Sequence, residues 1–354
     1  MRLLRKEYKM SLTYQEIISQ YDALKKTYEL FRKHAEELKT FVNSENFSLI
    51  AYVGCGSSYS IASGMAVTTQ MKLAKPSLSI AGGDLMLHHD RYKKILDGAL
   101  IVAVSRSGST SEVLKSINAL KNDGCRFKLL TFSAVENSKL SQISDFVFDM
   151  PWAFDQSVCQ TRTVTNFYLC GALFAAILDD DQGLLSELKA VIDNGENYLH
   201  LFEPVFKEVA GRKWGHGVVL GDAELCGICE EGALTFKEIC QVDSNYYHLL
   251  DARHGPMVMI KSDTLVIAVV DDPKNTYERG MIEDIVKKQA VVVVYSDIPC
   301  DLEGIINICY GKSLNPISRG IPFILIPQLI NYYKSAFTGA DPDKPEGLDP
   351  WIKL

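Results

Sequence analysis

The sequence predicts an α/β protein of two tandem domains, each a parallel sheet flanked by helices, with a helix at the N-terminus. At 354 residues the chain exceeds the usual size of one domain. Short β-rich runs alternate with helical segments, which is typical of parallel sheets. Both halves repeat the order strand, loop, helix, which suggests an ancient duplication. We expect a helical segment over residues 1–44, a first domain over 45–195 and a second domain over 196–354.

The first element is a predicted helix over residues 12–42, where apolar residues recur at helical spacing. Thr13 and Glu16 have the spacing of a capping box. The polar face of this helix is rich in Lys and Glu, so it is expected to face solvent or to pack on a partner subunit.

The remaining elements follow from runs of β-branched and apolar residues that alternate with amphipathic segments. In the first half we expect strands at Ser48–Val53, Ala99–Val104 and Phe127–Phe132 and helices at Tyr59–Lys72 and Thr110–Lys121. A charged segment, Asp179–Asp181, and a helix at Leu184–Tyr198 separate the halves. In the second half we expect strands at Gly217–Leu220, Leu249–Asp251, Thr264–Val270 and Ala290–Tyr295 and helices at Glu224–Glu238, Thr276–Lys287 and Pro327–Phe337.

The composition narrows the classes of partner. The residues are 47% hydrophobic and 23% charged, as in ordinary globular proteins, so the whole chain is expected to fold. A net charge of −7 with scattered Lys and Arg argues against nucleic acid, whereas helix N-termini can still bind a small anion. No run approaches the ~20 apolar residues of a membrane span, and the N-terminus lacks a signal-peptide core. We therefore expect a cytoplasmic protein without membrane contact.

Nine cysteines at irregular spacings are expected to be reduced, and many lie in apolar runs. Cys226 and Cys229 form one short pair, but no second pair or histidine stands at zinc spacing. His88 and His89 also lack nearby ligand partners. A metal or redox role is the minor alternative for both pairs, and we expect neither a metal nor a cofactor.

Two predicted strands each run into a loop rich in glycine and serine, Gly54–Ser58 and Ser105–Thr110, and a helix follows each loop. Parallel strands present such loops at one sheet edge, where two helix N-termini can converge on an anion. Tyr59 occupies the place of the third glycine of a dinucleotide motif, and no Gly-Lys-Ser/Thr exists, so neither NAD nor ATP is indicated. The alternative to anion binding is that these glycines and serines only form tight turns and helix caps.

These loops resemble the two phosphosugar loops of SIS (sugar isomerase) domains, as in the isomerase half of glucosamine-6-phosphate synthase. The segment Gln160-Thr-Arg-Thr163 stands where that family has Ser-Thr-Lys before a further helix. The resemblance implies two flavodoxin-like three-layer sandwiches and a bound sugar phosphate. The implied binding residues of the first half are Gly56, Ser57, Ser58, Ser105, Arg106, Ser107, Thr110, Gln160 and Thr161. Taken alone, Arg106 is more readily explained as a surface arginine.

In the second half, Glu231-Gly-Ala-Leu-Thr-Phe-Lys-Glu238 and Arg253-His-Gly-Pro256 look like the family's catalytic segments. Their 16-residue interval, from Glu238 to His254, is also the family's. The resemblance implies that Glu238 and His254 form an acid/base pair, with Glu231 and Thr235 on the same helix face as Glu238. It further implies that His254 serves the neighbouring subunit of a homodimer, and such dimers could pair into tetramers. Taken alone, either member of the pair is more often solvated or simply hydrogen-bonded.

Two departures from the synthase pattern bear on the reaction. Thr235 replaces a lysine, and Pro350 stands where the family has a Schiff-base lysine, although Lys353 could substitute if the tail is shifted. No glutaminase segment precedes the first domain, so we expect no internal ammonia source. A threonine three residues before the glutamate also occurs in fructosamine-6-phosphate deglycases, which the chain therefore resembles.

The implied deglycase reaction is a proton transfer between C1 and C2 by Glu238, followed by hydrolysis, with ring opening by His254. The alternatives are an aldose–ketose isomerase, an amino-sugar-phosphate deaminase and a non-catalytic sugar-phosphate sensor.

Overall fold

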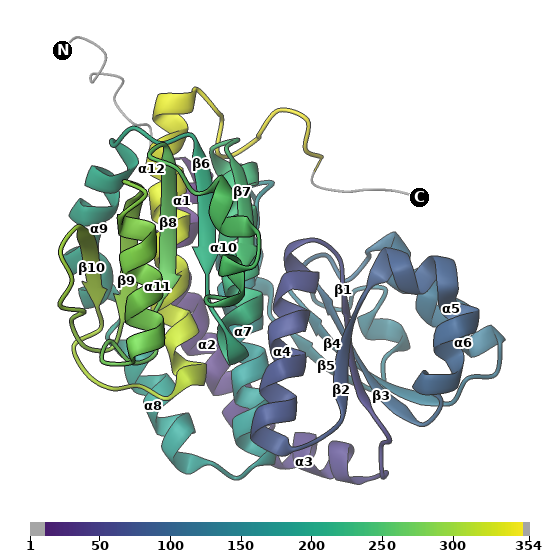
Figure 1. The fold of residues 1–354 in the computed structure, drawn as a ribbon. Helices are drawn as coiled ribbons and strands as arrows, with labels where there is room; N and C mark the ends of the chain where they lie inside the picture. The colour runs from purple at the N-terminus through teal and green to yellow at the C-terminus, as the bar shows by residue number, and fades with distance from the viewer. Residues whose placement is uncertain (1–10, 350–354) are drawn as a thin grey trace.

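A computed structural model describes residues 11–349, which form two parallel sheets of five strands each (Figure 1). The first sheet has the order β2-β1-β3-β4-β5 and the second has the order β10-β9-β8-β6-β7. If the strands of each sheet are numbered one to five along the chain, both sheets have the order 2-1-3-4-5. The predicted α/β class and the similarity of the two halves are therefore confirmed.

The central strands are apolar on both faces because helices cover both sides of each sheet. Every residue of β3 and of β8 is buried. The strands are β1 (Ile50–Gly54), β2 (Ser77–Ala81), β3 (Ala99–Ser105), β4 (Phe127–Ser133), β5 (Phe146–Asp149), β6 (His216–Leu220), β7 (Asp243–Tyr247), β8 (Thr264–Val269), β9 (Val291–Ser296) and β10 (Ile305–Cys309). The predictions for β1, β3, β4, β6, β8 and β9 are confirmed to within two residues at each end.

The four strands that the sequence did not predict, β2, β5, β7 and β10, all lie at sheet edges. Edge strands are less buried, so they need fewer apolar residues. The sequence of β7, Asp-Ser-Asn-Tyr-Tyr, shows this clearly. The predicted strand at Leu249–Asp251 is wrong: Leu249 is buried, but the backbone there turns into a short 3₁₀ helix, Asp251–Arg253.

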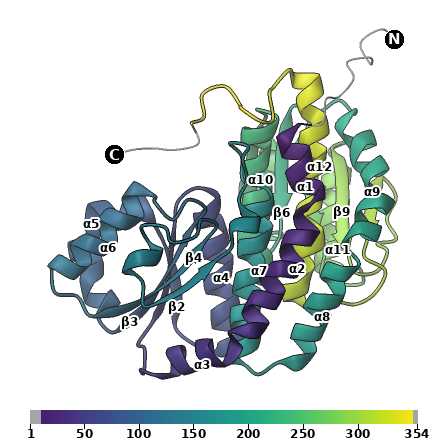
Figure 2. The same ribbon diagram turned by 180° about the vertical axis from the view of Figure 1, so that it is seen from behind.

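The helices of the described residues alternate with these strands (Figures 1 and 2). They are α1 (Leu12–Ile18), α2 (Gln20–Lys33), α3 (Ala35–Asn43), α4 (Ser57–Leu73), α5 (Gly82–Leu96), α6 (Ser111–Asn122), α7 (Arg162–Leu178), α8 (Gln182–Asp193), α9 (Gly195–Ala210), α10 (Cys226–Ile239), α11 (Thr276–Val286) and α12 (Gly320–Thr338).

The single helix predicted over residues 12–42 is wrong, because the chain bends at Ser19 and His34 into α1, α2 and α3. The Ser19 hydroxyl donates to the carbonyl of Gln15 at 2.6 Å, a local bond that competes with regular helix geometry. The capping box is also wrong, since Ser11 caps α1 by accepting from the Tyr14 amide. Thr13 bonds to the distant Asp343 instead.

Two more helix predictions are corrected at their ends. The helix predicted at Leu184–Tyr198 is two helices, because the chain breaks at Asn194 between α8 and α9. α12 begins at Gly320, seven residues before the predicted start at Pro327, and that proline lies inside the helix. α12 is largely buried, and tertiary packing stabilises the proline there against its poor helix propensity.

A layer of helices lies between the two sheets. In it α4 packs on α7 and α10, α10 packs on α12, and α2 packs on α7 from behind (Figures 1 and 2). The largest apolar cluster extends through this layer and includes residues of both sheets, such as Phe132 and Ile267. Two smaller clusters lie under the outer helices, one under α5 and α6 and one under α11. The two halves are therefore joined by a common core, and the domain boundaries stay a prediction.

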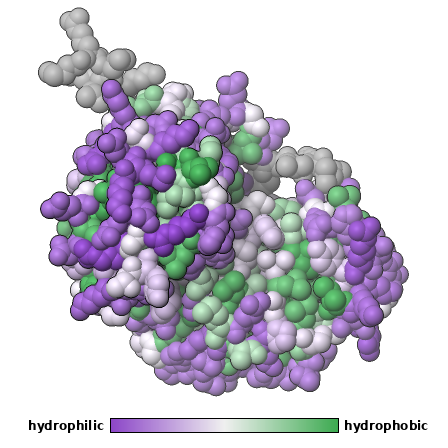
Figure 3. Space-filling model, viewed as in Figure 1, coloured by the Kyte–Doolittle hydropathy of each residue, from purple (hydrophilic) through white to green (hydrophobic). Residues whose placement is uncertain are grey.

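Polar side chains predominate on the face of the molecule in Figure 3, with apolar side chains interspersed among them. Of the helices in residues 11–349, none is long and apolar enough to cross a membrane.

Candidate active site

The first glycine-serine loop connects β1 to α4. Gly54 has no room for a side chain, because a Cβ atom there would lie 2.6 Å from the carbonyl carbon and oxygen of Ser58. Gly56 has a φ of 55°, a value that favours glycine. The helix begins directly afterwards at Ser57, so the first amides of α4 and the hydroxyls of Ser57 and Ser58 gather at this sheet edge.

The second loop leaves the neighbouring strand β3 at the same sheet edge. The Ser105 hydroxyl lies 2.8 Å from the Thr110 hydroxyl and accepts a bond from the Gly108 amide at 3.1 Å, so it holds the loop from within. Gly108 has a φ of 56°, and a Cβ atom there would lie 2.0 Å from the Ser138 hydroxyl oxygen. The Ser107 hydroxyl also bonds within the loop, where it accepts from the Ser109 amide at 3.2 Å.

Both loops line one cavity of about 790 Å³, which also receives residues from α10 and from the C-terminal tail. Its lining is Cys55, Gly56, Ser57, Ser58, Arg106, Ser107, Ser109, Thr110, Ser111, Glu112, Val135, Lys139, Phe154, Val158, Gln160, Glu238, Leu348 and Asp349. The structure thus brings together eight of the thirteen residues that the sequence indicated. The other five are Ser105, Thr161, Glu231, Thr235 and His254.

Helix α10 reaches the cavity because it packs unusually closely on α4. A Cβ atom at Gly227 would lie 2.2 Å from the Ser60 carbonyl oxygen and 2.4 Å from the Gly64 amide nitrogen. Glycines on both helices therefore allow their backbones to touch. This contact places the far end of α10, with Glu238, beside loops that come from the first sheet.

Glu238 has the electrostatics of a proton-transfer group. It is largely surrounded by protein but keeps contact with the cavity. Burial raises the pKa of Glu238 to about 7, although the positive charges of Arg106 and Lys237 act in the opposite direction. Near neutral pH this carboxyl group is therefore available in both its charged and its neutral form.

Arg106 is not the surface arginine that was the plain alternative, because it is 8% exposed. Its Nη1 donates to the carbonyls of Ser157 and Val158, both at 3.0 Å, and its guanidinium lies 5.9 Å from the centre of the Phe154 ring. Burial lowers the pKa of Arg106, while nearby acidic groups including Glu238 raise it. A buried cation is thus held at the cavity wall.

Four of the indicated residues lie behind the cavity lining. Ser105 is buried and its hydroxyl bonds within its own loop. Thr161 is fully buried, and its amide donates to the Asp155 carboxylate. The Thr235 hydroxyl donates to the Gly232 carbonyl and accepts from Asn331 Nδ2, both at 2.8 Å. Within the described residues, neither carboxyl oxygen of the fully buried Glu231 has a partner at hydrogen-bond distance.

The protonation of Glu231 follows from its surroundings. Burial raises the pKa of Glu231 well above its usual range, the charge of Glu238 adds to this, and the nearby Ser57 hydroxyl lowers it. These surroundings favour the neutral form of the Glu231 carboxyl group.

His254 lies apart from the cavity of its own chain. It is exposed and follows the short helix Asp251–Arg253, with its amide bonded to the Asp251 carbonyl at 2.8 Å. Three exposed apolar side chains lie close to it in sequence: Leu250 is 39% exposed, Val258 is 72% exposed and Met259 is 54% exposed. One chain therefore supplies Glu238, but not His254, to this cavity.

Sequence reasoning missed several residues of the lining. Lys139 and Val135 follow β4, Phe154 and Val158 precede α7, and Leu348 and Asp349 belong to the tail. No local motif marks them, because tertiary contacts bring them there: the Val158 amide bonds to the Asp343 carbonyl at 3.1 Å. Pro350 and Lys353 lie outside the described residues.

The other candidate ligand groups are dispersed. His88 faces Asp84 at 3.7 Å and His89 faces Asp123 at 3.3 Å. Among residues 11–349 no group of three His, Cys, Asp or Glu side chains is placed to hold a metal ion.

The fold and these loops define an α/β protein with two glycine-serine loops at one sheet edge, and residues 48–176 match the family model of the SIS domain. This match confirms, for that part of the chain, the resemblance inferred from the motifs of the first half.

Curated relatives agree with this family. The chain is similar to the glutamine–fructose-6-phosphate aminotransferase of Pyrobaculum aerophilum, with 27% identity over 310 residues, 84% of this chain and 50% of the relative. It is 26% identical over 339 residues to the same enzyme of Sulfurisphaera tokodaii, covering 92% of this chain and 52% of that protein. The chain spans about half the length of these relatives.

Solved structures share the fold over nearly the whole chain. The C-terminal domain of the glucosamine-fructose-6-phosphate aminotransferase of Francisella tularensis has a TM-score of 0.80 at 21% identity, covering 96% of this chain and 99% of that chain. The tagatose-6-phosphate ketose/aldose isomerase of Escherichia coli has a TM-score of 0.83 at 20% identity, covering 97% and 98%. Both sheets thus match the architecture of tandem SIS domains.

Proposed function

We propose that the chain is a phosphosugar enzyme, a fructosamine-6-phosphate deglycase. Its substrate is a 1-amino-1-deoxyketose 6-phosphate, in which C1 carries the amine and C2 is the carbonyl carbon. A proton leaves C1 and one is added at C2, while the nitrogen loses its proton and the C2 oxygen gains one, which gives an imine at C1 and a hydroxyl group at C2. Water then hydrolyses the imine to an aldose 6-phosphate and the free amine. The two products account for every atom of the substrate and of one water molecule.

The carboxyl group of Glu238 carries this proposal. It faces the cavity that both serine loops line, and burial raises its pKa to about 7. A group that takes a proton from one carbon and returns it to the next works best when its pKa lies near the working pH. Glu238 meets that requirement within the described lining.

The cavity also has features that suit a sugar phosphate. The amides at the start of α4 and the hydroxyls of Ser57, Ser58 and Thr110 can bind the phosphate. Gln160 lines the cavity, and its buried Oε1 has no hydrogen-bond partner among the described residues, so it can accept from a sugar hydroxyl. The volume of about 790 Å³ leaves space for a substituent on the amine.

The surroundings of Thr235 favour deglycation over a reaction through an enzyme imine. Its hydroxyl is already bonded to Gly232 and Asn331 behind the cavity, and no ammonium group stands there. Lys139 is the one lysine of the described lining, and it is exposed. A deglycase needs no enzyme imine, because its substrate already carries the nitrogen at C1.

We further propose that a second copy of the chain supplies His254 to the cavity, where it opens the sugar ring. Its exposure, its position outside its own chain's cavity and the exposed apolar side chains of Leu250, Val258 and Met259 support this arrangement. Burial of that apolar surface would stabilise the dimer.

The test is proton NMR of the purified protein with fructoselysine 6-phosphate and, separately, with fructose 6-phosphate with and without ammonium. We expect the wild type to release lysine and glucose 6-phosphate and Glu238→Gln to release neither. Conversion among the simple sugar phosphates without lysine release would contradict deglycation and indicate an isomerase or deaminase. Binding without any turnover would indicate a sensor.

A further inference from the structure

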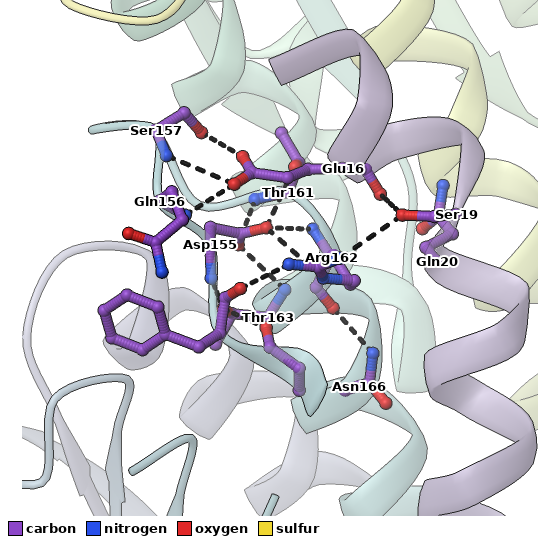
Figure 4. A network of polar contacts seen from close by, with 12 residues as sticks. Glu16, Ser19, Gln20, Asp155, Gln156, Ser157, Thr161, Arg162, Thr163 and Asn166 are labelled. Atoms are coloured by element: carbon purple, nitrogen blue, oxygen red, sulfur yellow. Dashed lines mark hydrogen bonds and ion pairs between the residues drawn. The ribbon is translucent and has the colours of Figure 1, made fainter. Parts of the chain in front are cut away.

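A buried polar network connects helix α1 to the loop before α7 (Figure 4). Glu16, on α1, is 4% exposed. Its Oε1 accepts from the amides of Gln156 and Ser157, and its Oε2 accepts from the Ser157 hydroxyl. One carboxylate from the N-terminal segment thus receives three hydrogen bonds from a loop about 140 residues away in the sequence.

The same loop is fixed at a second point by Asp155, which is 1% exposed. Its Oδ2 accepts from the amides of Thr161 and Thr163, both at 2.9 Å, and its Oδ1 accepts from the Arg162 amide at 3.1 Å. Asp155 therefore caps the N-terminus of α7, where a negative charge is favourable. Figure 4 shows Glu16 and Asp155 within this one network of polar contacts.

The middle of this loop holds Arg106. The Arg106 guanidinium donates to the carbonyls of Ser157 and Val158. Glu16 binds the amides of Gln156 and Ser157, so the two side chains hold adjacent peptide groups of the same loop. Arg106 lines the cavity with Glu238, and its positive charge acts on that carboxyl group. The order of contacts is thus Glu16, loop, Arg106, Glu238.

We propose that Glu16 is a positioning residue: by anchoring residues 156–158, it holds the Arg106 guanidinium beside the carboxyl group of Glu238. The inference rests on the proposed role of Glu238, but its test below needs no turnover. Glu16 touches neither the cavity nor Glu238 in the described contacts, so its effect passes through Arg106.

The charges around Glu16 and Glu238 determine in which direction the pKa of Glu238 should change when Glu16 is replaced. Glu238 faces Arg106 and Lys237, which lower its pKa, and lies near the buried Glu231 and Cys159. Glu16 faces Asp155 and Arg106. Removing the negative charge of Glu16 would by itself leave the pKa of Glu238 unchanged or lower it. Releasing Arg106 would raise it, because an opposite charge is lost from its neighbourhood.

The experiment is a ¹³C NMR titration of protein labelled at the glutamate carboxyl carbon, without substrate, with the Glu238 signal assigned from its absence in Glu238→Gln. We expect Glu16→Ala, which removes every acceptor of the loop amides, to raise the pKa of Glu238 by roughly 0.5–1 unit. Glu36→Ala, an exposed change on α3, is the matched control and should leave the pKa of Glu238 unchanged. An unchanged or lowered value in folded Glu16→Ala would overturn the proposal.

A second variant keeps the test decisive if Glu16→Ala does not fold. Ser157→Ala removes the hydroxyl that donates to Glu16 but keeps the carbonyl that holds Arg106. We expect a smaller rise of the same sign, and no rise in this variant would also overturn the proposal. Because the titration reports the pKa of Glu238 directly, it is independent of whether the substrate is a fructosamine phosphate.

Discussion

Replacing Glu238 by glutamine should stabilise the fold, and should do so more at high pH. The pKa of this carboxyl group is about 7 in the folded chain against an ordinary value of 4.5. Well below pH 4.5 the group is neutral in both states and does not affect the free energy of unfolding. Between pH 4.5 and 7 the unfolded chain loses this proton while the folded chain keeps it, so the wild type loses stability relative to the variant over that range, and the difference is nearly constant above pH 7.

The size of this effect follows from the shift in pKa. Each unit corresponds to about 1.4 kcal/mol, and contact with the cavity water reduces the full value, so Glu238→Gln should add about 2–3 kcal/mol to the free energy of unfolding at pH 8. At pH 5.5 the gain should fall to about 1 kcal/mol. The variant would thus gain stability and lose activity, as is common when a buried active-site group is replaced.

The assay is urea unfolding followed by tryptophan fluorescence at pH 8 and pH 5.5, with the exposed Glu36→Gln as the matched control. The control should have the same small effect at both values of pH. A Glu238→Gln variant that is less stable than the wild type at pH 8, or whose gain does not depend on pH, would refute the burial argument.

Three further predictions concern activity and packing. The kcat for lysine release should fall about tenfold from pH 8 to pH 6, because the base form of Glu238 is lost, and a flat profile to pH 5 would count against this carboxylate as the base. Inactive Glu238→Gln and His254→Ala chains, when mixed, should regain roughly a quarter of wild-type activity if each site is shared across a dimer, and no recovery would argue against sharing. Gly227→Ala should destabilise the protein by about 1–3 kcal/mol in urea unfolding, because its Cβ would meet the α4 backbone. Gly83→Ala, where a Cβ meets nothing within 4 Å, is the control, and equal effects of the two changes would contradict the close helix contact.

The sequence predicted those parts of the fold where burial dictates residue type. The central strands β3 and β8 are continuous apolar runs because both faces are covered, so they were evident from composition alone. The edge strands were missed because one side of each meets solvent and tolerates polar residues. The bends of the N-terminal helix depend on local side-chain bonds, such as that of Ser19, which an apolar spacing does not reveal.

The site was predictable where a short motif carries its geometry. Both serine loops combine glycines at positive φ with helix starts, so their convergence followed from a parallel sheet. The contributions of Phe154, Val158 and the tail depend on contacts between residues far apart in the sequence. The spacing of Thr13 and Glu16 suggested a local cap, whereas in the structure Glu16 accepts hydrogen bonds from the amides of Gln156 and Ser157.

The identity of the sugar phosphate released from fructoselysine 6-phosphate tests the central claim most directly. If Glu238 moves hydrogen from C1 to C2, proton NMR should show glucose 6-phosphate as the product of the wild type and no product with Glu238→Gln. Release of fructose 6-phosphate with both C1 hydrogens retained, or release at the wild-type rate by Glu238→Gln, would contradict the account.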